Sequence, residues 1–531
     1  MRKLFPLISI LLVSLFSCNR VQDGDHTLDI YITSDVHGSY FGKYYLDDSV
    51  KPNSLSKVST VLSQAREQGQ NVILIDNGDN LQGDNGAFYY NFVDTAGRHI
   101  FARMADYLQY DAIVVGNHDI EAGHPVYDRL KEQHTAPMLA ANAINLETGK
   151  PYFQEYTVFE RGGLKVAVIG MTNANVTSWI TESLYHGIEF RNCDDMAQAL
   201  VDRIRAREKP DFVIVSVHCG SGDEDTPSIE NDALYLAKHL QGVDLVIGGH
   251  DHRARANGYV NNDTPTGYVN PGARCNYIGH ATFTLTYKNG KCTGRSNEIE
   301  LTPLVDVDND PAFDAEFQKD YETVKQFTLR KICSVSETFS LAAALDGPSA
   351  YMNLLYCVQL AASGADITFA APLTSSGVIN AGDLVYNDLT RIYPFENKLF
   401  TIELTGSQIK NYLEYSYDRW IRREGPAYCY DSAGGIKYNV YKKRPAGERV
   451  EILSMEDGTP FEMDKTYTVA ITSYRAMGGD GLLTNGAGLD VSNPDAYIVG
   501  RFSEIRDLLY DYLEQAGTLE PKVCDNWKFI E

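Results

Sequence analysis

The sequence predicts an α/β protein of at least two domains. Between about residues 27 and 305, short β-branched and aliphatic runs alternate with helical stretches, which is typical of an α/β layered domain. The chain has 531 residues, more than one hydrophobic core usually organises. Hydrophobic residues make up 44% and charged residues 22%, an ordinary globular composition. The expected buried strands are residues 28–33, 71–75, 112–115, 165–169, 212–217 and 244–247.

A second domain is expected after an acidic connecting segment. Aromatic and aliphatic residues at helical spacing predict a linker helix within residues 306–330. Beyond it, apolar runs such as residues 367–369 and 399–402 predict a second α/β region. We therefore expect a first domain over 27–305 and a second over 331–531. The helically spaced residues of the linker are Phe313, Phe317, Tyr321, Val324 and Phe327.

The N-terminus has the features of an export signal. Arg2 and Lys3 precede an apolar run over residues 4–16 that is too short to span a bilayer. The run ends in a stretch that resembles the lipoprotein box of bacteria, in which Cys18 becomes the acylated first residue. We expect a signal peptide over 1–17, a tether over 18–26, and a lipid-anchored protein of the cell envelope, facing the periplasm or the outside. A plain secretory signal with an incidental cysteine is the alternative.

Charge and cysteine content narrow the function further. The formal charge of −24 disfavours binding to duplex nucleic acid. A small anionic substrate remains possible where a bound metal or a few arginines supply local positive charge. After Cys18, eight cysteines follow without C-x-x-C spacing, so a zinc-finger pattern is absent and any disulfide connectivity stays open.

Candidate metal ligands follow the predicted strands. Each of five strand ends bears an Asp, Asn or His. Asp and His two positions apart in an extended loop point the same way, so such pairs can converge on one centre. A set of oxygen and nitrogen donors without thiolates suits Mn, Zn, Fe or Co. Two divalent ions need about seven protein ligands, and seven are offered: Asp35, His37, Asp79, Asn117, His218, His250 and His252.

The order of these motifs resembles that of the calcineurin-like metallophosphoesterases: D-x-H, G-D-N, G-N-H-D, a lone His and G-H-x-H. With the second domain, the chain looks like the 5'-nucleotidase family, which includes 5'-nucleotidases and 2',3'-cyclic-nucleotide 2'-phosphodiesterase/3'-nucleotidases. The resemblance implies a β-sandwich with flanking helices, a C-terminal nucleotidase domain, and hydrolysis of nucleotide phosphate esters at two metals, which activate water and clamp the phosphoryl oxygens. It implies that Asp79 bridges the two ions. The first ion takes Asp35, His37, Asp79 and His252, and the second takes Asp79, Asn117, His218 and His250.

The resemblance also assigns a residue beside the metals. His118 matches the usual transition-state stabiliser or general acid of the family. Glu121, three residues on, would orient His118 and keep it protonated. Asp119 is the other candidate for that partner.

Two segments of the second domain resemble substrate-binding segments of the family, in which two aromatic rings stack on the nucleobase. Tyr430 precedes the pair Gly434-Gly435, and Tyr474 precedes Gly478-Gly479. Stacking tolerates any base. The second glycine pair would let the backbone come close to the ligand. Asp480, which follows this pair, would then be available to hydrogen-bond the base or the ribose.

The branch of the family depends on another stretch. The N-x-G-G-[IV]-R segment usual in 5'-nucleotidases is absent, and Ala371-Pro372 and Tyr393-Pro394 look more like the cyclic phosphodiesterase/3'-nucleotidase branch. Asp480 is shared with the 5'-nucleotidase pattern, so 5'-nucleotidase stays an alternative. Two further alternatives are a catalytically silent nucleotide-binding lipoprotein and a phosphatase of non-nucleotide esters. Base preference, native metal and oligomeric state are left open.

Overall fold

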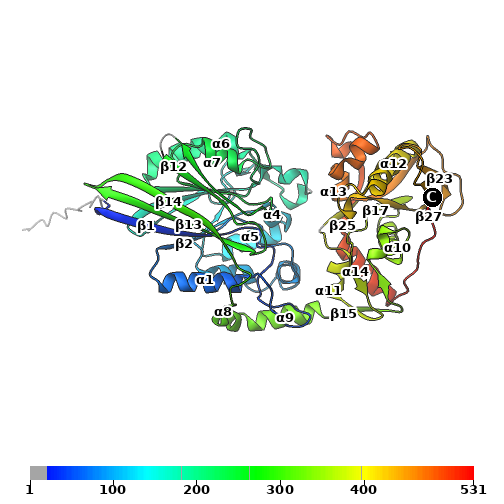
Figure 1. Cartoon of the computed structure of the whole chain (residues 1–531), viewed down its shortest axis with the longest axis horizontal. Helices are drawn as coiled ribbons and strands as arrows, with labels where there is room; N and C mark the ends of the chain where they lie inside the picture. Colours follow the sequence, from blue (N-terminus) through cyan, green and yellow to red (C-terminus); the bar gives the residue numbers. More distant parts are fainter. Residues whose placement is uncertain (1–20, 181, 262–263, 396) are drawn as a thin grey trace, which may run out of the picture.

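The computed structural model describes residues 21–531 except 181, 262–263 and 396, and these form two lobes (Figure 1). The first lobe runs from β1 (Gly24–Thr33) to β14 (Lys291–Pro303), and the second begins at β15 (Lys331–Val335). The expected signal peptide and Cys18 lie outside the described residues. Within them, no helix is both long and apolar enough to cross a membrane.

The first lobe is built on two six-stranded sheets. One has the order β14-β13-β1-β2-β3-β4 and the other the order β11-β12-β10-β9-β7-β6. Strands β1 to β4 of the first sheet are parallel, as are β7, β9, β10 and β12 of the second. The remaining strands of these sheets are β2 (Val72–Asp76), β3 (Ala112–Val114), β4 (Met138–Leu139), β6 (Tyr156–Arg161), β7 (Leu164–Met171), β9 (Phe212–Val217), β10 (Leu245–Ile247), β11 (Arg255–Asn261), β12 (Thr264–Asn270) and β13 (Tyr277–Lys288).

The two sheets share a core. Alternate residues of β1, namely Leu28, Ile30 and Ile32, are fully buried in the cluster that also holds Val168 of β7 and Ile214 of β9. Because side chains alternate along a strand, the other face of each sheet must be covered by helices, which explains the nearly continuous apolar runs of the sequence. The layered α/β fold predicted from these runs is confirmed.

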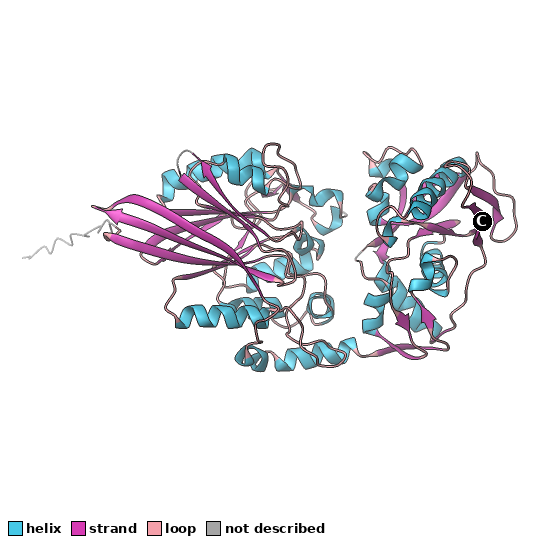
Figure 2. Ribbon diagram, viewed as in Figure 1, coloured by secondary structure: helices cyan, strands magenta, loops and turns pink. Residues whose placement is uncertain are grey.

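Helices cover the two outer faces (Figure 2). Leu55 and Leu62 of α1 pack with Leu74 of the first sheet. On the other side, Val201 of α6 packs with Val215 of the second sheet. The helices of these layers are α1 (Leu55–Glu67), α3 (Ile100–Leu108) and α5 (His124–Gln133) on the first sheet, and α6 (Cys193–Glu208) and α7 (Ala233–His239) on the second.

The connection between the lobes differs from the single expected helix. It contains α8 (Pro311–Glu316) and α9 (Gln318–Thr328), separated at Phe317, whose backbone leaves the helical region (φ −102°, ψ 11°). Phe313 and Tyr321 pack into the core of the first lobe, whereas Phe327 belongs to the core of the second. The connector is thus packed on the first lobe and reaches the second only with its last turn.

The second lobe is also α/β. Its central sheet has the order β21-β17-β24-β20-β25. Phe400 and Ile402 of β20 pack on one side with Leu413 of α12, and Leu399 packs on the other with Leu355 of α10. The main elements are α10 (Ala350–Ser363), β17 (Ile367–Ala370), β20 (Lys398–Thr405), α12 (Gly406–Arg422), β21 (Ser432–Gly434), β22 (Ile436–Tyr441), β23 (Val450–Met455), β24 (Thr466–Thr472), β25 (Ile498–Glu504), α14 (Ile505–Ala516) and β27 (Trp527–Ile530).

Candidate active site

The predicted metal ligands gather at one edge of the sandwich. Asp35 and Asp79 follow the parallel strands β1 and β2, and His218 and His250 follow β9 and β10. Asn117 begins the short helix α4 (Asn117–Glu121) after β3. Since the carboxyl ends of parallel strands share an edge, five distant segments place their donors in one place.

The loops reach this geometry through left-handed backbone, not through the extended conformation expected from the spacing. Five of the seven residues have positive φ, a conformation that side chains bearing a Cβ rarely adopt and that costs of order 1 kcal/mol or more at each position. Backbone hydrogen bonds hold it: the Asp35 N–H donates to Gly78 O (2.8 Å) and the His37 N–H to Asp79 O (2.9 Å). The φ values are 50° at Asp35, 48° at His37, 61° at Asp79, 64° at His250 and 58° at His252.

One group of donors consists of Asp35, His37 and His252. The Nε2 atoms of His37 and His252 are 2.9 Å apart, and His252 Nε2 is 3.4 Å from Asp35 Oδ1. Two imidazole nitrogens and a carboxylate oxygen that face each other so closely offer three lone pairs to one small cation.

The other group consists of Asp79, His218 and His250, with Asn117 beside it. His250 Nδ1 is 2.9 Å from Asn117 Oδ1. His218 Nε2 and Asp79 Oδ2 lie 3.0 Å apart without hydrogen-bond geometry, and neither of these buried atoms has a hydrogen-bond partner among the described residues. Buried polar atoms are rarely left unpaired, so this arrangement fits a divalent metal.

The electrostatics also favour a bound cation. Burial lowers the pKa of the His37 imidazole to about 4, which keeps its ring neutral and able to ligate. Burial also lowers the pKa of His218, but the carboxylates of Asp79 and Asp35 outweigh it and raise the value to about 10. The Asp79 and Asp35 carboxylates thus need a positive partner, which a metal can supply in place of the imidazolium proton.

His118 lies beside the second group. Its backbone N–H donates to Asp79 Oδ1 (2.8 Å), and its ring Nδ1 is 2.6 Å from Glu121 Oε2. The alternative partner, Asp119, is engaged elsewhere, because its carboxylate accepts the backbone N–H groups of residues 79, 80, 81 and 116. The structure therefore pairs His118 with Glu121, and Asp119 organises the loops around them.

Glycines in the motifs are required by close approach of the loops. A Cβ on Gly116 would lie 2.1 Å from Asp79 Oδ1, and one on Gly78 would lie 2.5 Å from Gly116 N. A Cβ on Gly249 would lie 2.4 Å from Ser34 Oγ. The glycines therefore let three ligand-bearing loops touch.

Two residues near the metal donors were not predicted. Glu230 Oε1 is 3.1 Å from His250 Nε2, which directs the opposite nitrogen, Nδ1, to the donor group. Glu230 comes from a long loop without a motif, so spacing gave no sign of it. Arg274 lies in the turn Pro271-Gly272-Ala273-Arg274, where its N–H donates to Asp35 O (2.7 Å).

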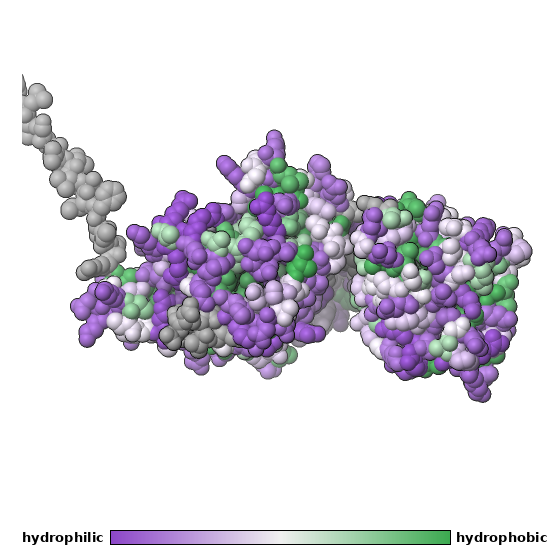
Figure 3. Space-filling model, turned by 90° about the horizontal axis from the view of Figure 1, so that it is seen from above, coloured by the Kyte–Doolittle hydropathy of each residue, from purple (hydrophilic) through white to green (hydrophobic). Residues whose placement is uncertain are grey.

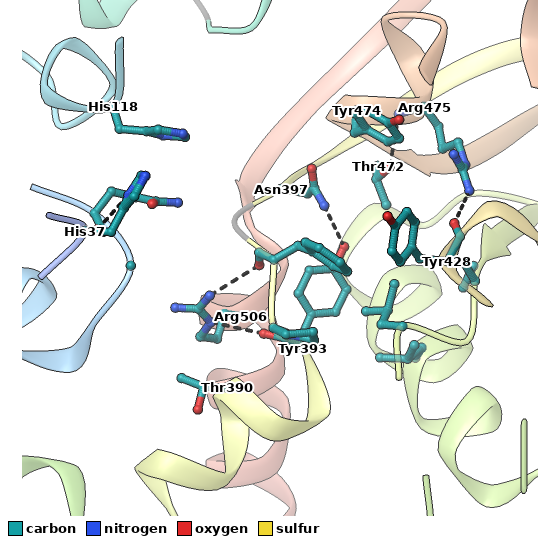
Figure 4. A pocket seen from close by; sticks show the side chains of 18 of the residues that line it. His37, His118, Thr390, Tyr393, Asn397, Tyr428, Thr472, Tyr474, Arg475 and Arg506 are labelled. Atoms are coloured by element: carbon teal, nitrogen blue, oxygen red, sulfur yellow. Dashed lines mark hydrogen bonds between the residues drawn. The ribbon is translucent and has the colours of Figure 1, made fainter. Parts of the chain in front are cut away.

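A cavity of about 580 Å³ extends from this centre to the second lobe. Figure 4 shows His37 and His118 on one side and Tyr428 and Tyr474 on the other. From above, the two lobes lie side by side, and hydrophilic and hydrophobic residues are mixed over the visible face of each (Figure 3). The residues that line the cavity include His37, His118, His252, Arg274, Ala371, Tyr393, Pro394, Phe395, Tyr428, Asp431, Tyr474, Arg475 and Arg506.

The two predicted aromatic residues have different surroundings. Tyr474 lines the cavity and is 49% exposed. Tyr430 does not line it: its ring is 2% exposed and stacks on Trp420 with centroids 5.7 Å apart, and its hydroxyl donates to Gly425 O. A base cannot stack on a ring that the core already covers. Tyr428, two residues earlier and 40% exposed, lines the cavity instead, with its ring edge-on to Phe395.

Asp480 also differs from expectation. One carboxylate oxygen pairs with the Arg475 guanidinium, and the other accepts from Cys429 Sγ (3.4 Å). The carboxylate therefore positions Arg475, which lines the cavity, whereas Asp480 is not among the lining residues. Gly479 leaves room for the ring of Tyr474, because a Cβ at this position would lie 2.5 Å from that ring.

Comparisons with known proteins agree with this arrangement. The calcineurin-like phosphoesterase family model matches residues 28–254, and the 5'-nucleotidase C-terminal domain model matches residues 330–485. A 2',3'-cyclic-nucleotide 2'-phosphodiesterase/3'-nucleotidase of Haemophilus influenzae is 26% identical, covering 100% of this chain and 92% of the relative. A 5'-nucleotidase of Vibrio cholerae is 24% identical, covering 94% and 92%.

A solved structure shares the whole fold. A Staphylococcus aureus protein proposed to be a 5'-nucleotidase, solved with α-ketoglutarate, superposes with a TM-score of 0.77 at 22% identity, covering 95% of this chain and 99% of its own. The chain therefore belongs to the calcineurin-like metallophosphoesterases that carry a C-terminal 5'-nucleotidase domain.

Proposed function

We propose that the chain hydrolyses phosphate esters of nucleotides with two divalent metal ions. One observation carries this proposal: a single cavity has the metal donors His37 and His252 at one end and the exposed rings of Tyr428 and Tyr474 at the other. A generic phosphatase needs only the first end. Exposed aromatic rings opposite a metal centre suit a ligand that has both a phosphate and a flat base.

Each group of residues has a distinct role in this proposal. When bound, the ions supply an activated water and neutralise the phosphoryl oxygens. Asp35, His37, Asp79 and His252 would hold one ion, and Asp79, Asn117, His218 and His250 the other. Glu121 holds His118 at Nδ1, so a protonated His118 would donate to a phosphoryl oxygen through Nε2.

We favour a 2',3'-cyclic-nucleotide 2'-phosphodiesterase/3'-nucleotidase activity. After β17, the segment that in 5'-nucleotidases contains an arginine has Ala371 here, and this residue lines the cavity. Arg475, which also lines it, is neutralised by Asp431 and Asp480. Arg274 and Arg506 also line the cavity, but without the arginine of that segment the wall has one positive group fewer, which favours a singly charged cyclic diester over a doubly charged monoester. The relatives include both activities, so 5'-nucleotidase is the second candidate.

The deciding experiment compares rates on 2',3'-cyclic AMP, 3'-AMP and 5'-AMP with Mn²⁺ supplied, and with the Asp79→Asn variant as the blank. We expect the cyclic diester and 3'-AMP to be hydrolysed faster than 5'-AMP. The reverse order would assign the chain to the 5'-nucleotidases. Equal turnover of sugar phosphates would indicate a phosphatase of non-nucleotide esters, and binding without turnover would indicate a silent nucleotide-binding protein.

The same preparations would establish the metal. Elemental analysis of the purified protein should find two ions per chain from among Mn, Zn, Co and Fe, because the donors are nitrogen and oxygen atoms without thiolates. One ion per chain in a fully active preparation would contradict the two-metal proposal.

We further propose that the protein is exported and anchored at Cys18. The apolar run over residues 4–16 and the lipoprotein-like box that ends at Cys18 support this proposal. Labelling with a fatty-acid analogue should modify the wild-type chain and leave Cys18→Ala unlabelled. Label that persists in the variant would rule out this anchor.

A further inference from the structure

A second cluster of buried reactive side chains lies behind the metal donors. Cys193 is the first residue of α6, Cys219 follows the metal-ligand candidate His218, and Asp232 directly precedes α7. The three are 2%, 0% and 0% exposed. The two sulfur atoms are 3.8 Å apart.

This contact is unusual within the chain. Among the eight cysteines that the structure describes, only this pair brings two sulfur atoms within hydrogen-bonding distance. Both sulfurs lie in a core of aliphatic side chains that includes Val217 and Ala233. Cys193 Sγ also lies 3.4 Å from Thr172 O and 3.7 Å from Asn142 Nδ2.

Two kinds of site are compatible with two sulfurs and a carboxylate at this spacing. A structural metal site would normally take four ligands, and among the His, Cys, Asp and Glu side chains that the structure describes, three donors converge here. Two thiolates and a carboxylate around one divalent ion would also leave a net negative charge in an apolar core, which is costly. A disulfide is neutral and needs no fourth group.

We propose that Cys193 and Cys219 form a disulfide bond in the mature protein. To form the bond, the sulfurs must approach from 3.8 Å to about 2.05 Å. The bond would join the start of α6 to the loop that holds His218, and so restrain a metal-ligand loop from behind.

The oxidation is a thiol–disulfide exchange with an external disulfide. One cysteine thiolate attacks a sulfur of the external disulfide and forms a mixed disulfide, which releases the first thiol. The second cysteine then attacks the mixed disulfide, the Cys193–Cys219 bond forms, and the second thiol leaves. Two electrons pass to the external disulfide, whose two sulfurs gain the protons lost by the cysteines. Because both sulfurs are buried in the folded chain, the exchange must occur during folding.

The test counts thiols in the folded and refolded chain. The full chain is refolded with oxidised glutathione, then denatured and alkylated without reductant, and the peptides are mapped by mass spectrometry. We expect the peptides of Cys193 and Cys219 to stay linked and both residues to escape alkylation. Reduction should lower Tm by about 5 to 10 °C, and the double variant C193S/C219S should show no such shift. Cys333→Ser, a buried cysteine that makes no sulfur–sulfur contact in the described structure, is the matched control and should retain the shift.

Two results would overturn the proposal. Alkylation of both cysteines with unchanged metal content would leave a buried pair of free thiols. Alkylation after removal of metal by a chelator, together with loss of one metal ion per chain in C193S/C219S, would identify a structural metal site instead. Because thiols, metal content and Tm are measured directly, the outcome does not depend on the substrate of the enzyme.

Discussion

The cavity has two walls that place their residues by different means. The metal wall on the first lobe includes His37 and His252, and the aromatic wall on the second lobe includes Tyr428 and Tyr474. On the first lobe, the seven predicted ligands lie in segments that follow strands, and they gather as two neighbouring groups of possible metal donors with Asn117 beside one of them. On the second lobe, the predicted Tyr430 is buried and the nearby Tyr428 is exposed, although only one residue separates them.

The difference lies in how much the local sequence determines. At the metal centre, Gly78, Gly116 and Gly249 permit contacts that a Cβ would block, so each motif fixes both the loop and the side chain it presents. At the aromatic wall, Tyr428 lies in a short 3₁₀ turn (Ala427–Cys429) and Tyr430 directly after it. There, packing against Trp420 decides which ring the core takes.

The strongest test of the metal wall is Asp79→Asn. Its carboxylate faces His218 Nε2 and is in the second donor group, so replacing it removes the proposed shared anionic ligand. We expect activity on every substrate to fall by at least about 10³-fold, and metal content to fall with it. Near-normal turnover and metal content would contradict the two-metal proposal. Thermal unfolding with and without metal would separate lost binding from lost folding.

The next largest effect is expected from His118→Ala. The ring lies 5.4 Å from that of His37 between centroids and belongs to neither donor group, so metal content should stay unchanged while kcat falls by about 10²-fold or more. Glu121→Gln should retain the hydrogen bond to Nδ1 but lose its charge, and should therefore show a smaller loss. An unchanged kcat in His118→Ala would make the residue structural.

The sequence predicted the fold and the convergence of the candidate metal ligands because both follow from strand periodicity and motifs at strand ends. It did not predict the left-handed backbone at Asp35 and Asp79, which depends on hydrogen bonds between loops. Nor did it predict Glu230, since a residue that orients His250 from a long loop has no fixed spacing. The sequence also predicts that Asp480 contacts the ligand. Its pairing with Arg475 depends on how the chain packs, and no spacing in the sequence indicates it.

At the aromatic wall, Tyr474→Ala should affect only substrates that have a base. Loss of about 1 to 3 kcal/mol of stacking predicts a drop of roughly 5- to 150-fold in kcat/KM for nucleotides. Bis(p-nitrophenyl) phosphate lacks a nucleobase and should show little change. Tyr428→Ala should behave in the same way. An equal loss on both substrate types, or a large fall in Tm, would assign the ring to the fold.

Glu230→Gln tests whether a residue outside the motifs tunes the metal wall. The amide keeps the shape of the side chain but removes the charge facing His250 Nε2, so metal affinity should fall by about tenfold. Titration of metal-free protein with Mn²⁺ would measure the change directly. Glu224→Gln, on the same loop and paired with Lys238, is the control and should leave the affinity unchanged.

The smallest effect should come from Tyr430→Phe, which separates the two neighbouring tyrosines. The change keeps the ring against Trp420 and removes only the hydroxyl that donates to Gly425 O. One neutral hydrogen bond contributes about 1 kcal/mol, so the free energy of unfolding should fall by that order while kcat/KM for nucleotides changes less than about twofold.

Tyr428→Phe also keeps its ring, but in the cavity, where stacking does not need a hydroxyl; it too should leave kcat/KM nearly unchanged. In nucleotide turnover the two positions then differ only on truncation: Tyr430→Ala should destabilise the lobe, whereas Tyr428→Ala should weaken nucleotide turnover in a folded protein. If Tyr430→Phe instead reduced turnover as strongly as Tyr428→Ala, the buried ring would have to reach the substrate, and the distinction between a core tyrosine and a cavity tyrosine would fail.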